Sequence, residues 1–492
     1  MIKDLVFKTP EQGGLDSKHI IKFIEQMKRY KVNMHSFLMA RNGDVFAEAY
    51  YKPFDENFAH RLYSCSKTYV ALAIGLMVGE GKIKVSDKIC DFFPDLIEVA
   101  PDEWLKETTI EDMLTMSTSY HITTYHDRKF KEWAKTFFNR YKSTYPAGTI
   151  YRYNTSASYL LDVLVERLSG KTFLEYLRPV FDKIGVSNDI WCVKAPDDYS
   201  WGGSGVISTL RDFAKVGEFL LNKGEVNGEQ LIPRDYMEKA CSPLVYQTSY
   251  NSFTPFQDNG YGYQIWCYED GAYGMRGMGM QIIYCNPKTN FLFACQADTQ
   301  GSDHVAGQLL FELLIDEINA NFNDAPVEET NYAKLQQMIS ELSVDNVKFG
   351  KDSSETEQKV NGVKYVLNEN EMGWKWFRLN YDADVCYIEY ENARGVKKIN
   401  FGKGSYVKGT FPETSYYDVQ VDTPANRALD CYAIGSWLDD KSLLIRTYVT
   451  DTSLGNLFIK IVFKGNDVGL SLVKVAEFFM DDYNGLAGGR AE

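Results

Sequence analysis

The sequence predicts an α+β domain, with an antiparallel sheet flanked by helices, followed by a smaller all-β domain that is either a sandwich or a barrel. Strand-like hairpins occur early and late in the first part of the chain, with helical patterns between them. Beyond residue 346, short strand-like runs alternate with polar turns. The 492 residues also exceed what one hydrophobic core usually supports. We therefore expect a first domain over residues 1–320, a linker over 321–345 and a second domain over 346–492.

The chain begins with a predicted helix and a predicted β-hairpin. Apolar side chains recur at helical spacing within residues 15–31, at Ile20, Phe23, Ile24 and Met27. Residues 36–40 and 45–51 are strand-like, and the Asn42-Gly43 pair between them is a strong signal for a short hairpin turn.

Helices are predicted for the middle of the first domain. They cover residues 68–81, 110–116, 156–168 and 209–221, and most of them end close to a glycine. Two strands, 280–285 and 291–297, and a helix over 305–320 complete the domain. If the early and late hairpins share one sheet, the helices pack on its faces.

The second domain is predicted from regularly spaced short strands. Strand-like runs lie at 363–367, 374–379, 385–390, 397–401, 433–437, 442–449 and 457–463. Such spacing, with polar turns between the runs, is typical of a sandwich or a barrel. A short helix is expected in the linker at 335–342, and no motif of recognisable chemistry occurs in this part of the chain.

Charge and composition exclude several classes of partner. Lys and Arg number 53 against 67 Asp and Glu, a net charge of −14, which argues against nucleic acids and anionic membranes. The nine cysteines form no C-x-x-C pair, which favours a reducing compartment. Residues 1–11 lack the pattern of a signal peptide, and the longest apolar run, 70–78, is too short to span a membrane. We expect a cytoplasmic protein.

The strongest chemical signal is the segment 60–67, which precedes the apolar helix. Ser64 and Lys67 are three residues apart, so a helix that begins near Ser64 places both side chains on one face. Backbone N–H groups at a helix N-terminus favour developing negative charge, and apolar neighbours favour the neutral, basic form of a lysine. Such a pair can activate a serine without histidine. The alternative is that Ser64 caps the helix and Lys67 is a solvated lysine.

Several segments, in order, resemble the serine β-lactamase-like family, which includes class C β-lactamases, penicillin-binding DD-peptidases and many esterases and amide hydrolases. These segments are 9–13, 60–67, 79–83, 91–95 and 110–117, within a resemblance that spans about residues 9–312. The resemblance implies that Ser64 attacks a carbonyl while Lys67 takes its proton. It implies an acyl-enzyme and neither a metal nor an organic cofactor.

The second motif of the family, Tyr-x-Asn, follows a Pro-Gly-Thr-like turn, here at 146–149. The resemblance places Tyr153 at the tyrosine, as the proton donor to the leaving group, with Tyr151 as a competing candidate. Thr155 occupies the asparagine position and Asn154 stands one residue early, so both are candidates to contact substrate. The alternative is that Tyr151 and Tyr153 are ordinary core or groove aromatics among the 33 tyrosines.

The third motif, Lys-Thr-Gly or His-Thr-Gly on a strand, corresponds to residues 275–277. Met275 replaces the cation, Gly277 is retained, and Arg276 brings a charge one position along. Because side chains alternate along a strand, Arg276 is expected to point away from the pocket unless a bulge at Gly277 turns it inward. Arg276 and Gly277 remain substrate-binding candidates. The resemblance implies that the backbone N–H groups of Ser64 and Met278 form the oxyanion hole.

These observations predict a serine hydrolase that acts on a small neutral ester or amide. A DD-peptidase, a β-lactamase or an acyltransferase of the same fold is the alternative, and a non-catalytic binding or sensor protein is the alternative of another class. Residues 202–206 lack the last glycine of G-x-S-x-G, which disfavours an α/β-hydrolase. The spacing of His121 and His126 gives no zinc motif. A homo-oligomer is left open.

Overall fold

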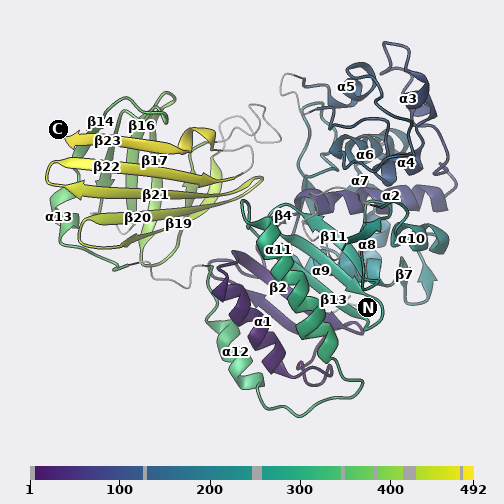
Figure 1. Ribbon diagram of the computed structural model, residues 1–492, viewed down its shortest axis with the longest axis horizontal. Coiled ribbons are helices and arrows are strands. Elements are labelled where there is room, and N and C mark those ends of the chain that lie inside the picture. The colour runs from purple at the N-terminus through teal and green to yellow at the C-terminus, as the bar shows by residue number, and fades with distance from the viewer. Residues whose placement is uncertain are drawn as a thin grey trace. The chain divides into compact units, whose positions relative to one another are not determined.

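The computed structural model describes residues 6–125, 130–246, 258–344, 350–381, 385–413, 428–476 and 480–492, with the backbone alone at 258, 259, 303 and 304. The chain divides into two compact units, Met1–Val344 and Asp345–Glu492. Unit 1 combines a sheet with helices and unit 2 is built mainly of strands (Figure 1). The prediction of an α+β domain followed by a smaller all-β domain is confirmed.

Unit 1 is organised around an eight-stranded sheet, in the order β1-β3-β2-β13-β12-β11-β10-β9. Its strands are β1 (Val6–Phe7), β2 (Met34–Arg41), β3 (Asp44–Tyr50), β9 (Asp258–Tyr261), β10 (Trp266–Tyr268), β11 (Tyr273–Gly277), β12 (Gln281–Asn286) and β13 (Phe291–Ala297). Strand β2 pairs antiparallel with β13, so the early and late hairpins share one sheet as expected. The short β1–β3 pairing is parallel, which makes the sheet mixed.

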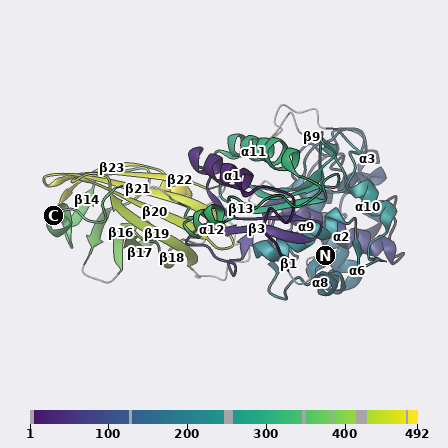
Figure 2. The same ribbon diagram turned by 90° about the horizontal axis from the view of Figure 1, so that it is seen from below.

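Helices cover both faces of this sheet. Helices α1 (Ser17–Arg29) and α11 (Asp303–Glu312) lie on one face and α9 (Leu210–Leu221) lies on the other (Figure 2). The Phe23 ring of α1 contacts Phe37 of β2 at 5.4 Å and Phe293 of β13 at 5.8 Å. The amphipathic pattern of the first helix therefore directs its apolar face into the core.

The remaining elements of unit 1 form a helical part beside the sheet. They are β4 (His60–Arg61), η1 (Tyr63–Cys65), α2 (Ser66–Gly79), η2 (Ile89–Phe92), α3 (Glu103–Glu107), α4 (Ile110–Leu114), α5 (Trp133–Asn139), α6 (Thr155–Ser169), α7 (Phe173–Tyr176), α8 (Arg178–Ile184), β5 (Trp191–Cys192), β6 (Val206–Ser208), β7 (Glu225–Val226), β8 (Glu229–Gln230) and α10 (Arg234–Ala240). Helix α2 is buried on nearly all sides, as its continuous apolar sequence predicts, and it packs against α6.

The segment expected to be a linker, 321–345, contains helix α12 (Tyr332–Ser340). Leu335 and Leu342 are fully buried, and both belong to the core that α1 and the sheet form. The preceding helix α11 continues through η3 (Leu313–Ile318) and η4 (Asn319–Asn321). Residues 321–344 thus pack as part of unit 1, because their leucines complete the apolar layer over α1.

Unit 2 is a closed barrel, one of the two architectures that the strand pattern allowed. Its ten strands are β14 (Lys364–Leu367), β15 (Trp376–Asn380), β16 (Cys386–Asn392), β17 (Gly395–Lys403), β18 (Val407–Phe411), β19 (Leu429–Trp437), β20 (Ser442–Thr450), β21 (Leu454–Lys464), β22 (Asp467–Val475) and β23 (Gly485–Ala491). A parallel pairing of β17 with β19 closes the sheet on itself. Two short helices, α13 (Thr356–Val360) and η5 (Asp481–Tyr483), accompany the strands.

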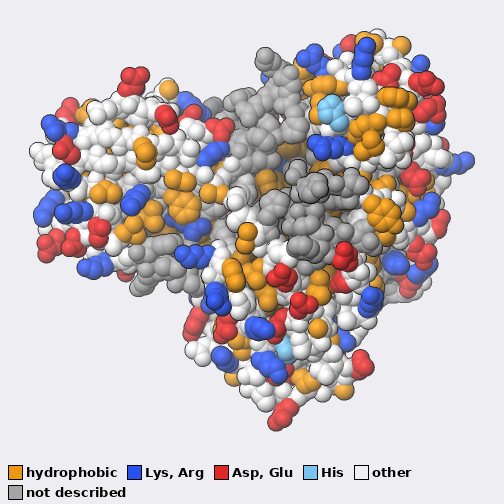
Figure 3. All heavy atoms as spheres, viewed as in Figure 1, with side chains coloured by type: hydrophobic (Ala, Val, Ile, Leu, Met, Phe, Trp, Pro, Cys, Tyr) orange, Lys and Arg blue, Asp and Glu red, His pale blue; other side chains and the backbone are white. Residues whose placement is uncertain are grey.

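Acidic and basic side chains are interspersed over the face that Figure 3 shows. In the part of the chain that the structure describes, no helix is long and apolar enough to cross a membrane. All nine cysteines are free thiols.

Candidate active site

The turn η1 presents Ser64 at the surface. Tyr63, Cys65 and Ser66 are buried, whereas Ser64 is partly exposed. Tyr63 adopts a left-handed backbone conformation with φ of 46°, and the Ser66 hydroxyl donates to its carbonyl at 2.6 Å. These features bend the chain sharply just before α2. Ser64 is therefore the one hydroxyl of this segment that the fold directs outward.

Lys67 lies one turn further along, as the spacing predicted. Its side chain is only 1% exposed. The Lys67 Nζ donates to Ser64 Oγ at 3.0 Å and to the Gly203 carbonyl at 2.6 Å. The lysine is thus held against the serine from inside the protein, and it is not the solvated first-turn lysine of the alternative interpretation.

The loop at 201–205 supplies a contact that the sequence reasoning missed. Its glycines permit a tight turn, and a Cβ at Gly202 would lie 2.6 Å from the Asp162 Cβ. A Cβ at Gly203 would lie 2.6 Å from the Thr155 methyl group. The loop therefore packs directly on α6. The hydrogen bond from Lys67, and no signal in the sequence, shows that the Gly203 carbonyl faces this lysine.

Tyr153 immediately precedes the cap of α6 and reaches the same serine. Lys67 Nζ lies 5.0 Å from the centre of the Tyr153 ring. Burial raises the pKa of Tyr153 above its ordinary value, and a hydrogen bond to the Ser64 side chain lowers it in part. The phenol therefore keeps its proton at neutral pH and can donate it. The competing candidate, Tyr151, packs its ring against Tyr261 at 5.5 Å.

The two residues after Tyr153 have different surroundings. Asn154 is fully buried and caps α6, because its Oδ1 accepts from the Ser156 N–H at 3.0 Å. Its Nδ2 donates to Thr118 Oγ1 at 3.3 Å. Thr155 is partly exposed at the first turn of the helix. In this arrangement Asn154 fixes the segment that carries Tyr153, and Thr155 lies closer to solvent.

The end of β11 packs against the segment that carries Ser64. A Cβ at Gly277 would lie 2.2 Å from the Leu62 carbonyl oxygen, so only glycine fits there. The following residue, Met278, accepts at its carbonyl from Gln281 Nε2 at 3.0 Å. The Cys65 thiol in turn donates to the Gln281 carbonyl at 3.1 Å. The β11–β12 turn and η1 are therefore tied to each other.

Arg276 is held among aromatic rings. It is 7% exposed, and its guanidinium carbon lies 4.9–5.0 Å from the ring centres of Trp266, Tyr268 and Phe311. Its Nε donates to the Tyr268 hydroxyl at 3.2 Å. Trp266 also stacks on Tyr153, with ring centres 5.7 Å apart. An aromatic cluster therefore bounds the site. The Arg276 guanidinium lies within this cluster and is largely withdrawn from solvent.

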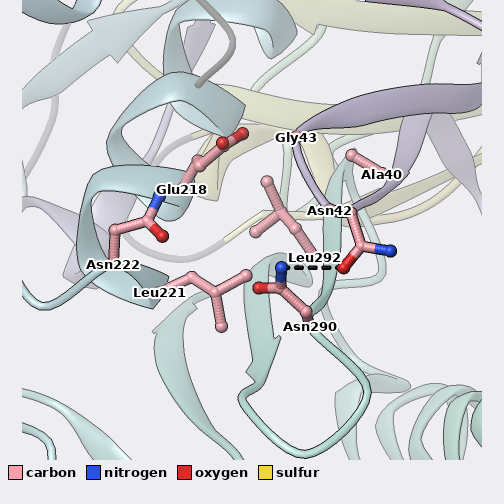
Figure 4. Close-up of a pocket in the computed structure, with 8 residues that line it drawn as sticks. All are labelled: Ala40, Asn42, Gly43, Glu218, Leu221, Asn222, Asn290 and Leu292. Carbon is pink, nitrogen blue, oxygen red and sulfur yellow. Dashed lines mark hydrogen bonds between the residues drawn. The ribbon is translucent and has the colours of Figure 1, made fainter. Parts of the chain in front are cut away.

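Several cavities lie away from these residues. One, of about 110 Å³, is drawn in Figure 4, and its lining residues are Ala40, Asn42, Gly43, Glu218, Leu221, Asn222, Asn290 and Leu292. It lies beside the β2–β3 and β12–β13 turns, at the opposite end of the sheet from the β11–β12 turn. In the described ranges, no group of three or more His, Cys, Asp or Glu side chains could hold a metal. His126 lies outside the described residues.

The mixed sheet between two helical layers, with a Ser–Lys–Tyr constellation at the start of a buried helix, defines a β-lactamase-fold hydrolase. The sequence profile of the Beta-lactamase family matches residues 22–314. The chain belongs to this family, and the predicted resemblance is confirmed.

Three similar proteins illustrate the range of the fold. The 6-aminohexanoate-dimer hydrolase of Paenarthrobacter ureafaciens is 22% identical over 276 residues, which cover 52% of this chain and 70% of that protein. An octameric penicillin-binding protein homologue from Pyrococcus abyssi is 16% identical with a TM-score of 0.50, over 96% of this chain and 99% of that one. EstCE1, a hydrolase with promiscuous acyltransferase activity, is 16% identical with a TM-score of 0.50, over 61% and 98%. The structural likenesses define the fold.

Proposed function

We propose that this protein is a serine hydrolase that cleaves a small neutral ester or amide through an acyl-enzyme on Ser64. The observation that carries the proposal is the placement of Lys67 Nζ 3.0 Å from Ser64 Oγ, with the Tyr153 hydroxyl bonded to the same side chain. A base and an acid thus meet at one partly exposed hydroxyl. The neighbouring Cys65 is no rival nucleophile, because burial raises the pKa of its thiol well above the usual range.

In the acylation step, Ser64 Oγ attacks the carbonyl carbon while neutral Lys67 accepts the hydroxyl proton. The developing oxyanion is bound by the backbone N–H groups of Ser64 and Met278, each worth about 2.7–4 kcal/mol of transition-state stabilisation. Tyr153 donates its proton to the leaving group and regains one from Lys67. The leaving alcohol or amine departs, and the acyl group remains as an ester of Ser64.

In the second step, water attacks the ester and the same groups return its proton to Ser64. An alcohol or amine could replace water, so acyl transfer is a second candidate function. The similarity to EstCE1, described as a hydrolase with promiscuous acyltransferase activity, favours testing it. The similarity to a 6-aminohexanoate-dimer hydrolase favours an amide among the substrates.

The preference for a neutral substrate rests on the third motif. Met275 stands where the family resemblance implies a cation, and it is 1% exposed. Arg276, the nearest charge in the sequence, is packed among Trp266, Tyr268 and Phe311. Thr155 and Gly277 are proposed to contact the substrate, and Asn154 is proposed to position Tyr153. This arrangement disfavours the carboxylate-bearing substrates of a β-lactamase or DD-peptidase.

Covalent labelling with a fluorophosphonate tests the nucleophile. Ser64→Ala should abolish labelling and lower kcat/KM by at least about 10⁴-fold, because the covalent step needs that oxygen. The matched control is Ser66→Ala, which removes a buried hydroxyl that donates to Tyr63 and accepts from the Val206 N–H at 2.9 Å. It should lower the Tm but keep labelling.

Turnover measured for Tyr153→Phe and for Tyr151→Phe tests which tyrosine is the general acid. The first should slow turnover by about 10²–10⁴-fold and the second only slightly, because Tyr153 alone is assigned the proton transfer. Wild type that remains unlabelled by every probe would favour the non-catalytic alternative. Labelling that survives in Ser64→Ala would show that another residue is the nucleophile.

A further inference from the structure

The Gly203 carbonyl is a fixed partner of Lys67, and its position depends on the loop at 201–205. Lys67 Nζ donates to it at 2.6 Å, which is shorter than its 3.0 Å bond to Ser64. A glycine-rich turn has little stiffness of its own, because glycine restricts the backbone least. Some neighbouring group must therefore fix where this carbonyl points.

Asp162 provides that contact from α6. Its side chain is fully buried, and its Oδ2 accepts from the Gly202 N–H at 3.0 Å. The loop also touches the carboxyl-bearing side chain directly, since a Cβ at Gly202 would lie 2.6 Å from the Asp162 Cβ and 2.6 Å from Val70 Cγ2. The turn is therefore enclosed between α6 and α2, the helix that carries Lys67.

We infer that Asp162 is a positioning residue for the reaction: it holds the Gly202–Gly203 turn so that the Gly203 carbonyl meets Lys67. The inference rests on the proposed function, in which Lys67 is the base. One helix then controls two contacts of the lysine. Tyr153, whose ring lies 5.0 Å from Lys67 Nζ, immediately precedes the N-cap of this helix, and the third turn of the helix carries Asp162.

Asp162 acts by geometry rather than by charge. Burial and the nearby Glu166 and Asp197 raise the pKa of Asp162 well above its usual range, against the Gly202 N–H, which lowers it. The charged group on the other side of the loop is Arg61, which donates to the Ser204 carbonyl at 2.9 Å. The Asp162 carboxyl offers Gly202 an acceptor in either protonation state. Asparagine reproduces that acceptor and alanine does not.

The test compares full-length Asp162→Asn and Asp162→Ala by the rate of fluorophosphonate labelling and by kcat/KM for an ester, from about pH 5 to about pH 10. Glu166→Ala is the matched control, because Glu166 lies one turn along the same helix and accepts from the Ser200 N–H at 3.0 Å. It removes an acidic acceptor for the same segment of chain without touching the Gly202 bond.

Asp162→Ala should slow labelling at least about tenfold and move the acid limb of the pH profile to lower pH. The limb moves because the ammonium form of Lys67 loses an acceptor and gives up its proton more readily. Asp162→Asn and Glu166→Ala should stay within about threefold of wild type with an unmoved limb. Circular dichroism and the Tm establish that each variant folds.

The inference is overturned if Asp162→Ala behaves as wild type, if Glu166→Ala matches its loss, or if labelling slows with the acid limb unmoved. If Asp162→Ala does not fold, Gly202→Ala decides. The added methyl group would displace the Gly202–Gly203 turn while the Asp162 carboxyl remains. If the acid limb of the pH profile does not move in this variant, the inference fails. Ser64→Ala is labelled in parallel: if it still reacts, the proposed function fails, whatever the Asp162 variants show.

Discussion

Each of the two units buries a cluster of hydrogen-bonded polar side chains, and the two clusters have opposite characters. In unit 2, Glu413 accepts from Tyr483 at 3.1 Å, from Arg394 at 3.0 Å and from Asn392 at 3.2 Å, while Tyr390 and Tyr483 share a further hydrogen bond. Both tyrosines are at most 1% exposed. This network satisfies its members within the barrel.

In the cluster of unit 1, Lys67 is similarly buried, but Ser64 is partly exposed to solvent. Its lysine donates hydrogen bonds to that serine and to the Gly203 carbonyl. Burial alone therefore does not separate a site from a structural network. The difference lies in whether the cluster presents a side-chain atom that a substrate can reach.

The largest effect should come from removing the centre of each cluster. Lys67→Ala should lower kcat/KM by about 10³–10⁴-fold while the chain stays folded, because Ser64 loses the group proposed as its base. Glu413→Ala should instead lower the free energy of unfolding by about 1–3 kcal/mol, because the buried Tyr483 and Asn392 lose an acceptor. Denaturant unfolding and labelling rates measured on both variants distinguish the two outcomes.

The contrast between a structural network in unit 2 and a reactive site in unit 1 is contradicted if Glu413→Ala abolishes turnover while circular dichroism shows that the chain is folded. The barrel would then contribute to the chemistry. It also fails if Lys67→Ala retains turnover, since the lysine would then be a structural cation like those of the barrel. Glu413→Gln is the control for the barrel, because it keeps an acceptor for Tyr483.

Acid should affect unit 1 before unit 2. All 6 histidines of the chain lie at or before residue 304, and His60 is fully buried, with its ring nitrogens 3.0 Å from His35 Nδ1 and from the Arg61 carbonyl. Burial lowers the pKa of His60 from 6.5 to about 4. Between these values the unfolded chain binds a proton that the folded chain does not, so stability falls as the pH falls. The loss is on the order of 3 kcal/mol.

Hydrogen exchange of peptides from each unit, followed from about pH 7 to about pH 4, measures this difference. Peptides of unit 1 should lose protection first, and His60→Gln should flatten their pH dependence. Above pH 6.5 the imidazole is neutral in both states, so no effect is expected there. Earlier loss of protection in the barrel, or an unchanged profile in His60→Gln, would contradict the prediction.

The sequence was most informative where geometry is local. Ser64 and Lys67 could be paired because helical residues three apart share a face. Tyr153 could be placed only through the order of motifs in the family. Gly203 and Asp162 were missed because their contacts join segments that are distant in the chain, and nothing in a glycine-rich run specifies which carbonyl faces a lysine.

In the fold, too, local patterns were predictable from the sequence and long-range pairings were not. Alternating hydrophobicity identified most strands of the barrel, but three strands, β18, β22 and β23, were not predicted. Strand β23 contains Gly485, Gly488 and Gly489, whose missing side chains weaken the alternation. Closure depends on the pairing of β17 with β19, which no local pattern encodes. Residues 321–344 looked like a linker because their polar composition conceals Leu335 and Leu342, which complete the core of unit 1.

The smallest effect concerns a pair of arginines, one in each unit, that both pack on aromatic rings. Arg276 lies 4.9 Å from the Tyr268 and Phe311 ring centres, and Arg446 lies 4.3 Å and 4.8 Å from those of Tyr448 and Phe458. If Arg276 is structural, Arg276→Ala and Arg446→Ala should both leave substrate charge preference unchanged within about threefold.

The measurement is kcat/KM for a neutral ester and for its carboxylate analogue, in wild type and in both arginine variants. A cation about 4 Å from a substrate carboxylate, at an effective dielectric near 20, would contribute about 4 kcal/mol, which is a preference of about 10³-fold. Wild type should show no such preference for the anion, because Arg276 is 7% exposed and Met275 occupies the position of the cation. A strong preference that disappears in Arg276→Ala, and persists in Arg446→Ala, would make Arg276 a carboxylate-binding residue. The site would then be closer to the β-lactamases and DD-peptidases of its family than to a neutral esterase.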